Sequence, residues 1–448
     1  MRQLIILLLF CVNLLAGLSS YAQEIATSWE GGKGTQDDPY QIADISQLRK
    51  LADDCNKGTS FKGKYLCLIK DITDNAQVLD SEGNLIGDSD NLRLWTAIGK
   101  NKECSFQGHF DGRGHCISGI FTGHVWNNVY GFIPINNEKV QGVFHYVENC
   151  TIENVIIRDS FFSCFVLFPT ETKINNCINF ATTSWGLVDG IQTGASNVEI
   201  FNCGNYGIAY GAGIANGHNR VCLSLINCYN FGEIRIAYYT AGGLCASAGK
   251  IYNCMNAGKV IRAENARSDS GAGICRYLPG NSTRTICLSN CVNYGVIEPF
   301  GDGYNGAIVG CLGTKKYSYT AYLKNIYWLE TTSPYAIAPS WSEQRYELTG
   351  ESLKMTEDEM KSEEFLAKLN SNAKALGSQY CGWKMGKQGF PILDIIDEDN
   401  SDVRNVPLDY SDSTETYYTL QGCKIENPSN GLFIKVSNTG VEKVFIKH

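Results

Sequence analysis

Charged residues and prolines are scarce in this 448-residue chain, which has 19% charged residues and 10 prolines. A chain with so few charges is poorly suited to long surface helices, whose solvent faces need Lys and Glu. Basic residues are not in excess either, since the net charge is −8. This argues against nucleic acid and anionic membranes as partners, because both attract basic patches.

Long apolar runs are missing beyond the N-terminus, so the sequence predicts no transmembrane segment. The N-terminal run, Leu4 to Leu18, follows Arg2 and precedes the small-x-small site Ser20-Tyr21-Ala22. This arrangement is typical of a secretory signal whose cleavage leaves Gln23 first. We therefore expect a secreted or outer-surface location.

A short phrase, Asn-Cys-x-Asn-x-Gly, recurs through the middle of the chain at steps of 25 or 26 residues and then 37. Polar loop insertions account for the long step. A period in this range predicts a stacked repeat, because each unit buries its apolar face only against its neighbours. The copies, the first of which ends in alanine, are Asn176–Ala181, Asn202–Gly207, Asn227–Gly232, Asn253–Gly258 and Asn290–Gly295.

Each repeat carries a second phrase of small residues halfway along, such as Gly211-Ala212-Gly213-Ile214. A unit of about 25 residues with two tight turns predicts one coil of a parallel β-helix. The Asn before each cysteine is expected to turn the chain in the left-handed region, with its amide stacking on the next Asn. The closing Gly is expected to form a further tight corner.

Cysteines at one point of successive coils are expected to stack as small buried hydrophobes. Stacking does not readily supply the separation and Cβ direction of a disulfide, so most of the thiols are predicted to be free. No Cys-x-x-Cys pair or Cys/His cluster has zinc spacing. The sequence therefore predicts no metal, no cofactor and no catalytic residue.

The ends of the chain differ from the repeats. Apolar positions in Ile45 to Gly58 predict an amphipathic helix that plugs the first coil, and Thr356 to Leu376 predicts a helix near the C-terminus. The fold class is all-β, a parallel β-helix with a helical N-cap, an α+β C-terminal cap and a small β tail. The predicted domains are a signal peptide (1–22), an N-terminal cap (23–60), the β-helix (61–348), a C-terminal cap (349–395), an acidic linker (396–415) and a β tail (416–448).

The phrases in Gly242 to Val260 closely resemble the GLUG-motif repeat of exported bacterial surface proteins. Trp29 to Ala52 and Phe106 to Gly119 match two further motifs common in such proteins, in the expected order. The segment Leu420 to Lys447 resembles the C-terminal sorting domain of the type IX secretion route. The resemblance implies adhesin-like surface binding on a parallel β-helix, and it brings no shared catalytic residues.

Three residues after the cysteine, aromatic side chains recur in four of the five repeats, with Ala257 in the other. If the cysteine points inward, alternation directs this position outward, where aromatic rings can stack on the apolar faces of sugars. The alternative is a packing ladder that stiffens the solenoid. The candidate ligand-binding residues are Phe180, Tyr206, Phe231 and Tyr294.

Two other features invite a catalytic interpretation. The cluster His109 to His115 contains histidine and aspartate, yet Gly112 and Gly114 favour a structural turn. No acidic column appears at the outward offsets of the repeat, although Asp189, Asp269 and Asp302 could still form a site in the loops. We expect an exported, non-catalytic protein that binds glycans or molecules of a host or neighbouring cell surface. The alternatives are a polysaccharide-degrading lyase or hydrolase and a purely structural protein.

Overall fold

The computed structural model describes most of the chain. Contacts divide it into two units, Met1–Ile396 and Asp397–His448. The predicted signal peptide and nearly all of the predicted linker lie outside the described residues. The described residues are 24–87, 89–127, 131–134, 142–190, 197–217, 223–236, 242–262, 271–278, 286–298, 305–312, 321–338, 346–398, 416–418, 424–425, 431–437 and 440–446.

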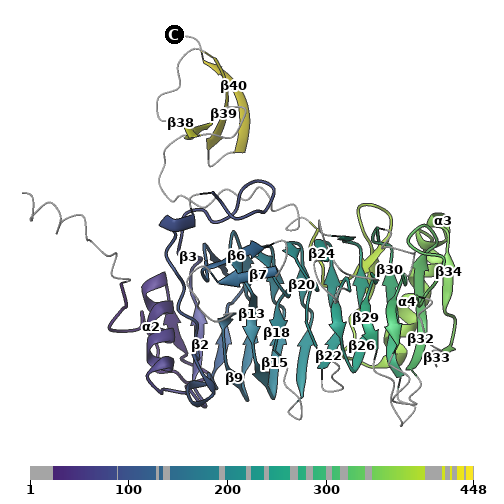
Figure 1. Ribbon diagram of the computed structural model, residues 1–448, viewed down its shortest axis with the longest axis horizontal. Helices are drawn as coiled ribbons and strands as arrows, with labels where there is room; N and C mark the ends of the chain where they lie inside the picture. Colours follow the sequence, from purple (N-terminus) through teal and green to yellow (C-terminus); the bar gives the residue numbers. More distant parts are fainter. Residues whose placement is uncertain are drawn as a thin grey trace, which may run out of the picture. The chain divides into compact units, whose positions relative to one another are not determined.

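The first unit is a parallel β-helix, as predicted (Figure 1). Equivalent strands of successive coils pair in parallel and in register, for example Ile174 with Ile200 and Leu225 with Ile251. The chain climbs one coil per repeat. The longest row of paired strands contains β2 (Tyr65–Leu68), β4 (His109–Asp111), β10 (Thr151–Glu153), β15 (Thr172–Asn175), β19 (Val198–Phe201), β22 (Leu223–Ile226), β26 (Lys250–Tyr252), β30 (Ile286–Asn293), β32 (Ala321–Leu329) and β33 (Tyr346–Thr349).

Short strands continue each coil along two further sides. The second side contains β5 (Cys116–Ser118), β11 (Ile156–Arg158), β16 (Ile178–Asn179), β20 (Gly204–Asn205), β23 (Tyr229–Asn230) and β27 (Met255–Asn256), after which β30 and β32 supply both sides. The third side contains β12 (Phe161–Phe162), β17 (Thr182–Thr183), β21 (Ile208–Ala209), β24 (Glu233–Ile236) and β28 (Lys259–Arg262). The coil is closed by β8 (Gly142–Phe144), β13 (Cys164–Leu167), β18 (Val188–Asp189), β25 (Cys245–Ser247), β29 (Cys275–Leu278) and β31 (Val309–Leu312).

The Asn before each cysteine turns the chain as predicted. Asn202 and Asn227 both have φ of 53°, in the left-handed region that Asn tolerates better than most residues. Their amides stack from coil to coil, because Asn227 Nδ2 donates to Asn202 Oδ1 at 2.9 Å and Asn253 Nδ2 to Asn227 Oδ1 at 2.9 Å. This ladder sets the corner between the first and second sides.

The second Asn of the phrase forms another ladder inside the coil, which the sequence did not lead us to expect. Asn205 Nδ2 donates to Asn230 Oδ1 at 2.7 Å, and Asn230 Nδ2 donates to Asn256 Oδ1 at 2.7 Å. All three side chains have no exposed surface. Hydrogen bonds therefore satisfy these amides, which would otherwise be costly to bury.

The closing Gly serves close packing rather than a left-handed corner. Gly207 and Gly232 are not among the residues with positive φ. A Cβ at Gly232 would lie 2.1 Å from the carbonyl oxygen of Gly207, and one at Gly258 would lie 2.1 Å from that of Gly232. Glycine is thus required because adjacent coils approach too closely for any side chain.

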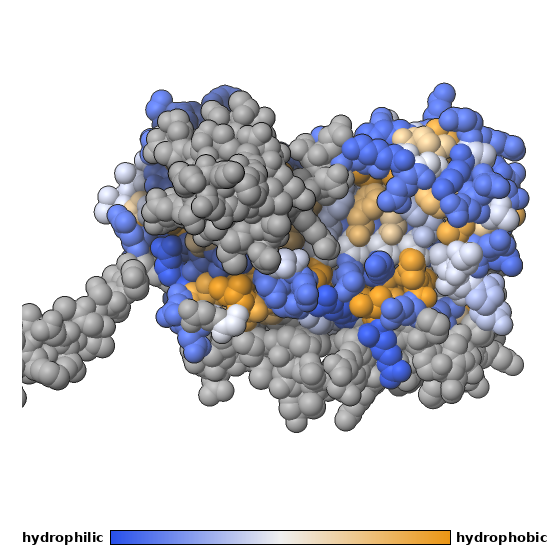
Figure 2. Space-filling view, turned by 90° about the horizontal axis from the view of Figure 1, so that it is seen from above, coloured by the Kyte–Doolittle hydropathy of each residue, from blue (hydrophilic) through white to orange (hydrophobic). Residues whose placement is uncertain are grey.

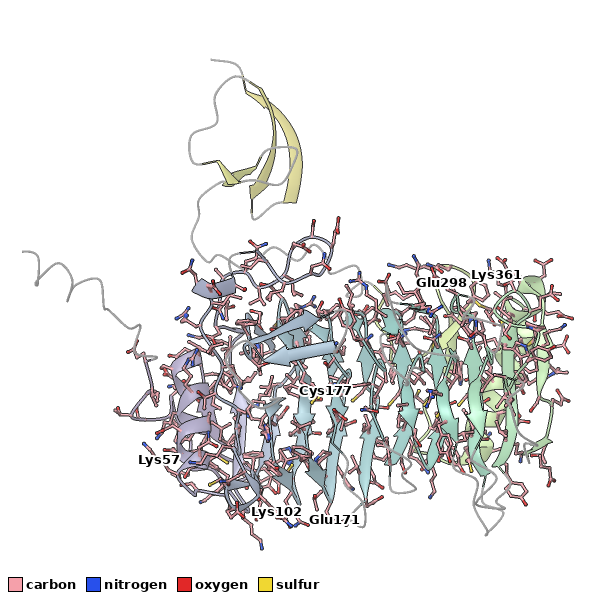
Figure 3. The ribbon with its side chains drawn as sticks, in the orientation of Figure 1. Lys57, Lys102, Glu171, Cys177, Glu298 and Lys361 are labelled. Atoms are coloured by element: carbon pink, nitrogen blue, oxygen red, sulfur yellow. The ribbon has the colours of Figure 1, made fainter. Side chains whose placement is uncertain are left out.

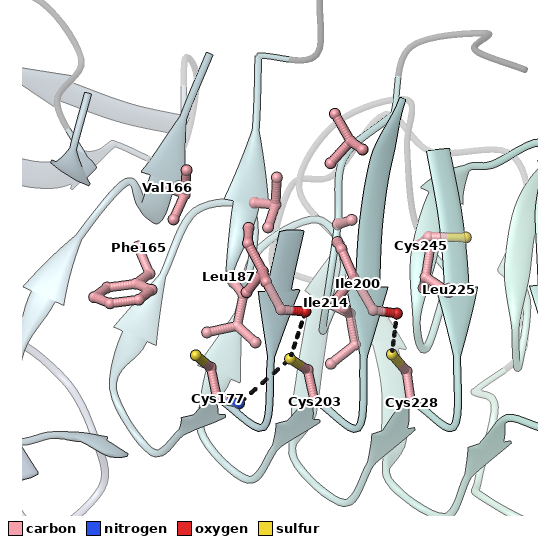
Figure 4. Close-up of a cluster of buried hydrophobic side chains, with 14 of the residues drawn as sticks. Phe165, Val166, Cys177, Leu187, Ile200, Cys203, Ile214, Leu225, Cys228 and Cys245 are labelled. Atoms are coloured by element: carbon pink, nitrogen blue, oxygen red, sulfur yellow. Dashed lines mark hydrogen bonds between the residues drawn. The ribbon is translucent and has the colours of Figure 1, made fainter. Parts of the chain in front are cut away.

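Inside the coils, the inner Asn ladder and the glycines of the second phrase lie between two apolar cores. A Cβ at Gly243 would come within 2.6 Å of the Asn256 side chain, so the glycine of the second phrase makes room for the inner Asn ladder. The larger core contains Ile200, Leu225 and the cysteine column, of which Cys177, Cys203 and Cys228 are visible in Figure 4. The smaller core contains Ala209, Ile234, Val260 and Ile297.

The predicted N-terminal helix is α2 (Ile45–Asn56), and the Asp44 side chain caps it by accepting from Gln47 N. Its buried face includes Leu48, Leu51 and Cys55, which join the larger core. Because this apolar face covers the first coil, α2 performs the plugging role expected of a terminal cap.

The predicted helix Thr356 to Leu376 is two helices, α3 (Glu357–Met360) and α4 (Glu363–Leu376). They separate at Ser362, whose hydroxyl accepts from Phe365 N at 3.2 Å and so caps α4. A hairpin follows, formed by β35 (Trp383–Met385) and β36 (Pro391–Leu393). We call residues 363–396 the C-terminal brace.

The C-terminal brace lies along the second side of the coils, where a simple end cap was expected. Its contacts reach four successive outer asparagines. Asn290 Nδ2 donates to Leu369 O at 3.2 Å, and Asn325 Nδ2 donates to Asn372 Oδ1 at 2.9 Å. Asn253 accepts from Trp383 Nε1 at 2.8 Å, and Asn227 Nδ2 donates to Gln379 O at 3.1 Å. The outer Asn ladder thus also holds the C-terminal segment.

The second unit contains a four-stranded antiparallel sheet. Its strands are β37 (Thr416–Tyr418), β38 (Lys424–Ile425), β39 (Gly431–Ser437) and β40 (Gly440–Ile446). The small β tail expected at the C-terminus therefore consists, in its described residues, of paired antiparallel strands.

Candidate functional site

The predicted aromatic residues come from the outward position that follows the inner Asn. Phe180 and Tyr206 stack with ring centroids 4.9 Å apart and planes 9° apart, and Tyr206 stacks on Phe231 at 5.2 Å and 6°. All three are half-buried. We call these three rings the aromatic stripe. Tyr294 is separated from it by Ala257 and stacks instead on Phe390 of the brace, at 4.5 Å.

Ring faces in the stripe are largely taken up by other groups. Tyr206 has a ring on each side, and the guanidinium of Arg158 lies 4.1 Å from the centroid of Phe180. Stacking of a sugar on the faces of Phe180 and Tyr206, as the sequence suggested, would require these contacts to break. Tyr206 and Phe231 also pack against the core that Tyr229 forms with the C-terminal brace, so the stacking favours the stiffening ladder and leaves only part of each ring exposed.

Tyr229 is a buried aromatic residue beneath the stripe, only 3% exposed, and the sequence analysis did not single it out. Its ring lies across Gly204 of the preceding coil, where a Cβ would come within 2.2 Å of the Tyr229 ring. Its centroid is 5.9 Å from that of Tyr206, with an edge-on geometry. Burial raises the pKa of Tyr229 well above its usual value. The signal was present, since the position after the cysteine is Gly204 in one coil and the large Tyr229 in the next.

A loop from the N-terminal part of the chain covers part of the third side. Asp159 accepts from Leu79 N at 2.8 Å, Thr182 Oγ1 donates to Gly83 O at 2.6 Å, and Arg235 Nη1 lies 3.4 Å from Asn84 Oδ1. The stripe therefore lies between this loop and the brace along the coil. Figure 2 views the molecule from above relative to Figure 1, and on that face apolar and hydrophilic patches lie side by side.

The cluster His109 to His115 consists of strand β4 and the turn that leads to β5, in agreement with the structural interpretation favoured from the sequence. Asp111 Oδ1 accepts from Arg113 N at 2.8 Å, and Arg113 has φ of 51°. Asn154 Nδ2 of the next coil donates to the same oxygen at 2.8 Å. His109 contacts Glu153 at 2.7 Å and stacks on Tyr65 at 5.1 Å, so both of its sides are engaged.

Asp189 is the described member of the three loop acids proposed for a catalytic site, because Asp269 and Asp302 lie outside the described residues. Its Oδ1 accepts from Gly190 N at 2.6 Å and from Asn216 Nδ2 at 2.9 Å. Burial raises its pKa to about 7 from 3.8. The carboxyl is therefore partly protonated at neutral pH.

This shift predicts a pH dependence of stability. The folded chain keeps the Asp189 proton up to about pH 7, whereas the unfolded chain releases it near pH 3.8. The contribution of this group to the free energy of unfolding is therefore largest below pH 3.8 and falls as the pH rises to 7. Thermal melts should show that Asp189→Asn weakens this decline, whereas the exposed Asp37→Asn should leave it unchanged. An identical slope in the Asp189 variant would contradict the assignment.

The thiols match the sequence prediction. Fifteen described cysteines are unbridged, and twelve of them are buried. Figure 3 shows Cys177 inside the coil and charged residues such as Lys57 and Glu171 at the periphery. Burial raises the pKa of Cys150 to about 12 and that of Cys203 well above its usual value, which keeps both protonated.

The described residues contain no group of three or more His, Cys, Asp or Glu side chains placed to hold a metal ion. Within the same residues, no helix has the length and apolar character needed to cross a membrane.

No family model matches the chain, and no curated protein is similar to it. One crystal structure, described as a "putative immunoglobulin A1 protease" from Bacteroides ovatus, is similar over 82% of this chain and 96% of that chain. The identity is 17% and the TM-score is 0.44, and a likeness this weak implies nothing about activity.

Proposed function

We propose that this protein is an exported, non-catalytic, adhesin-like protein that binds a glycan or another cell-surface ligand along the side of its β-helix. The observation that carries the proposal is the aromatic stripe, in which Phe180, Tyr206 and Phe231 stack in register and remain partly exposed. A surface held rigid before binding loses little conformational entropy when a ligand arrives. Aromatic residues are also enriched at binding surfaces.

The resemblance to GLUG-repeat surface proteins supports the same function. In those proteins the repeats accompany export and surface attachment, and the segment resembling a type IX sorting domain would serve the latter here. Glycans fit the stripe because the exposed parts of its aromatic rings offer apolar contacts to the C–H groups of a sugar.

Replacing stripe residues should weaken binding. We expect Tyr206→Ala combined with Phe231→Ala to lower affinity for a retained glycan about tenfold or more, as loss of an aromatic anchor does at other interfaces. Tyr335→Ala is a control, because Tyr335 is 49% exposed and is not part of the stripe. Circular dichroism should confirm that both variants remain folded. Equal affinity of a folded stripe variant and the control would reject the stripe as the binding surface.

A polysaccharide-degrading enzyme is the second candidate, and Asp189 is the observation that favours it. A carboxyl that keeps its proton near neutral pH can act as a general acid in glycoside cleavage. Release of soluble sugar products that is lost in Asp189→Asn would favour this candidate over binding alone.

A further inference from the structure

Two cysteines lie close together where the end of α2 meets the short 3-10 helix Lys102–Cys104, which precedes β4. Cys55 Sγ is 3.3 Å from the carbonyl oxygen of Cys104, and Cys104 Sγ is 3.5 Å from the carbonyl oxygen of Asn56. Each sulfur therefore reaches the backbone of the other cysteine's segment. The two residues are 49 positions apart in the sequence, so the contact joins distant parts of the chain.

The backbone on both sides of this contact is fixed by hydrogen bonds. Asn56 Oδ1 accepts from Lys100 N at 2.7 Å and from Gly99 N at 3.1 Å, and its Nδ2 donates to Ala97 O at 2.9 Å. Asn101 Oδ1 accepts from Cys104 N at 2.9 Å. Because both segments are already held in place, joining the sulfurs calls for side-chain rotation rather than refolding.

We propose that Cys55 and Cys104 form a disulfide when the chain enters an oxidising compartment. The inference rests on the proposed export for its cellular setting, although the pairing itself depends only on the local geometry. The product would link the end of α2 to residues 102–104 and hold the helix over the first coil. A link that closes a loop of this length restricts the unfolded chain and so favours the folded state.

The bond forms by two thiol–disulfide exchanges. The thiolate of Cys104, which is half-exposed, attacks a small-molecule or protein disulfide, forms a mixed disulfide and releases one thiolate. Cys55 then attacks the Cys104 sulfur, and its proton passes to the second thiolate as that thiolate is released. Two protein thiols are oxidised and the external disulfide is reduced. Burial raises the pKa of Cys55 to about 12, which favours Cys104 as the first attacking group.

The other thiols differ in how accessible they are to an external disulfide. Cys203 and Cys254 have no exposed surface and lie in the column inside the coils, so an external disulfide cannot reach them in the folded protein. Cys381 is half-exposed like Cys104, and its Sγ is 3.7 Å from Asn253 Nδ2. It therefore provides a control of similar exposure in another region.

The test uses the full chain, purified reduced and then treated with oxidised glutathione. Peptide mass spectrometry without reduction should find a Cys55–Cys104 peptide that has lost two hydrogen atoms. The melting temperature should rise by about 5 °C on oxidation, in line with a loop of this length. Cys104→Ser should abolish both effects, and Cys381→Ser should keep them.

Complete alkylation of Cys55 and Cys104 after this oxidation, or a link between other cysteines in their place, would overturn the proposal. Analysis of the protein secreted by cells separates the two inferences. The linked peptide in the secreted protein would support both the pairing and export. A link that forms in vitro in a protein retained in the reducing interior of the cell would support the pairing and reject export.

Discussion

Asn230→Ala is expected to destabilise the central coils by about 3–5 kcal/mol, because it interrupts the inner ladder in a buried position. Asn230 accepts from Asn205 Nδ2 and donates to Asn256 Oδ1, both at 2.7 Å. It also accepts from Gly232 N at 3.2 Å. Truncation leaves polar groups of three residues without these partners and opens a small cavity beside them.

Chemical denaturation and hydrogen exchange should measure this loss. In a solenoid each coil contacts only its neighbours, so exchange should accelerate most in the coils of Asn205, Asn230 and Asn256. Asn176→Gly is the matched control, because Asn176 is exposed and glycine accepts its φ of 50°. The control should cost at most about 1 kcal/mol. Similar losses in the two variants would contradict the role assigned to the buried ladder.

Arg49→Met is expected to release the N-terminal helix, at a cost of about 3–5 kcal/mol, because it leaves a buried carboxylate without its main partner. Arg49 Nη2 lies 2.6 Å from both carboxylate oxygens of Asp74, and the two side chains are 4% and 0% exposed. Arg93 Nε is 3.7 Å from Asp74 and offers only partial compensation. Burial raises the pKa of Asp74 even with both arginines beside it, so loss of Arg49 would disfavour the ionised carboxyl further.

The double variant Arg49→Met with Asp74→Leu should recover much of this stability, because replacing a buried ion pair by apolar groups is often tolerated. Hydrogen exchange in α2 is the measurement. Lys33→Met is the control, because its pair with Asp38 is exposed and spans 3.6 Å, and no measurable change is expected. Unchanged exchange in α2 of the single variant would show that the pair does not hold the helix.

The coil could be predicted from the sequence because its determinants are local and repeated. A repeat of fixed length implies stacked coils. The Asn before each Cys tolerates the left-handed region, and its side-chain amide hydrogen-bonds to the equivalent Asn of the neighbouring coil. Cys203 and its equivalents occupy small interior positions at every turn. These requirements recur in each repeat, so a single sequence contains several copies of the same signal.

Contacts between distant segments could not be predicted in this way. The apolar face of Phe365 and Leu369 indicated that α4 packs against something, but the sequence does not specify the side of the coils. Alternation correctly placed Tyr206 outward, yet it could not show that both ring faces are covered. Gly232 suggested a turn, whereas its requirement comes from the backbone of another coil. Each of these depends on the spacing between segments far apart in the chain.

Retention of the chain from Gln23 to Asp394 on immobilised glycans and polysaccharides tests the proposed function most directly. The eluted and soluble fractions should be analysed for sugar products in the same experiment. The proposal predicts retention on at least one glycan, competition by the same glycan in solution, and no soluble product. Absence of retention on every glycan would contradict glycan binding, and release of products would contradict a non-catalytic role.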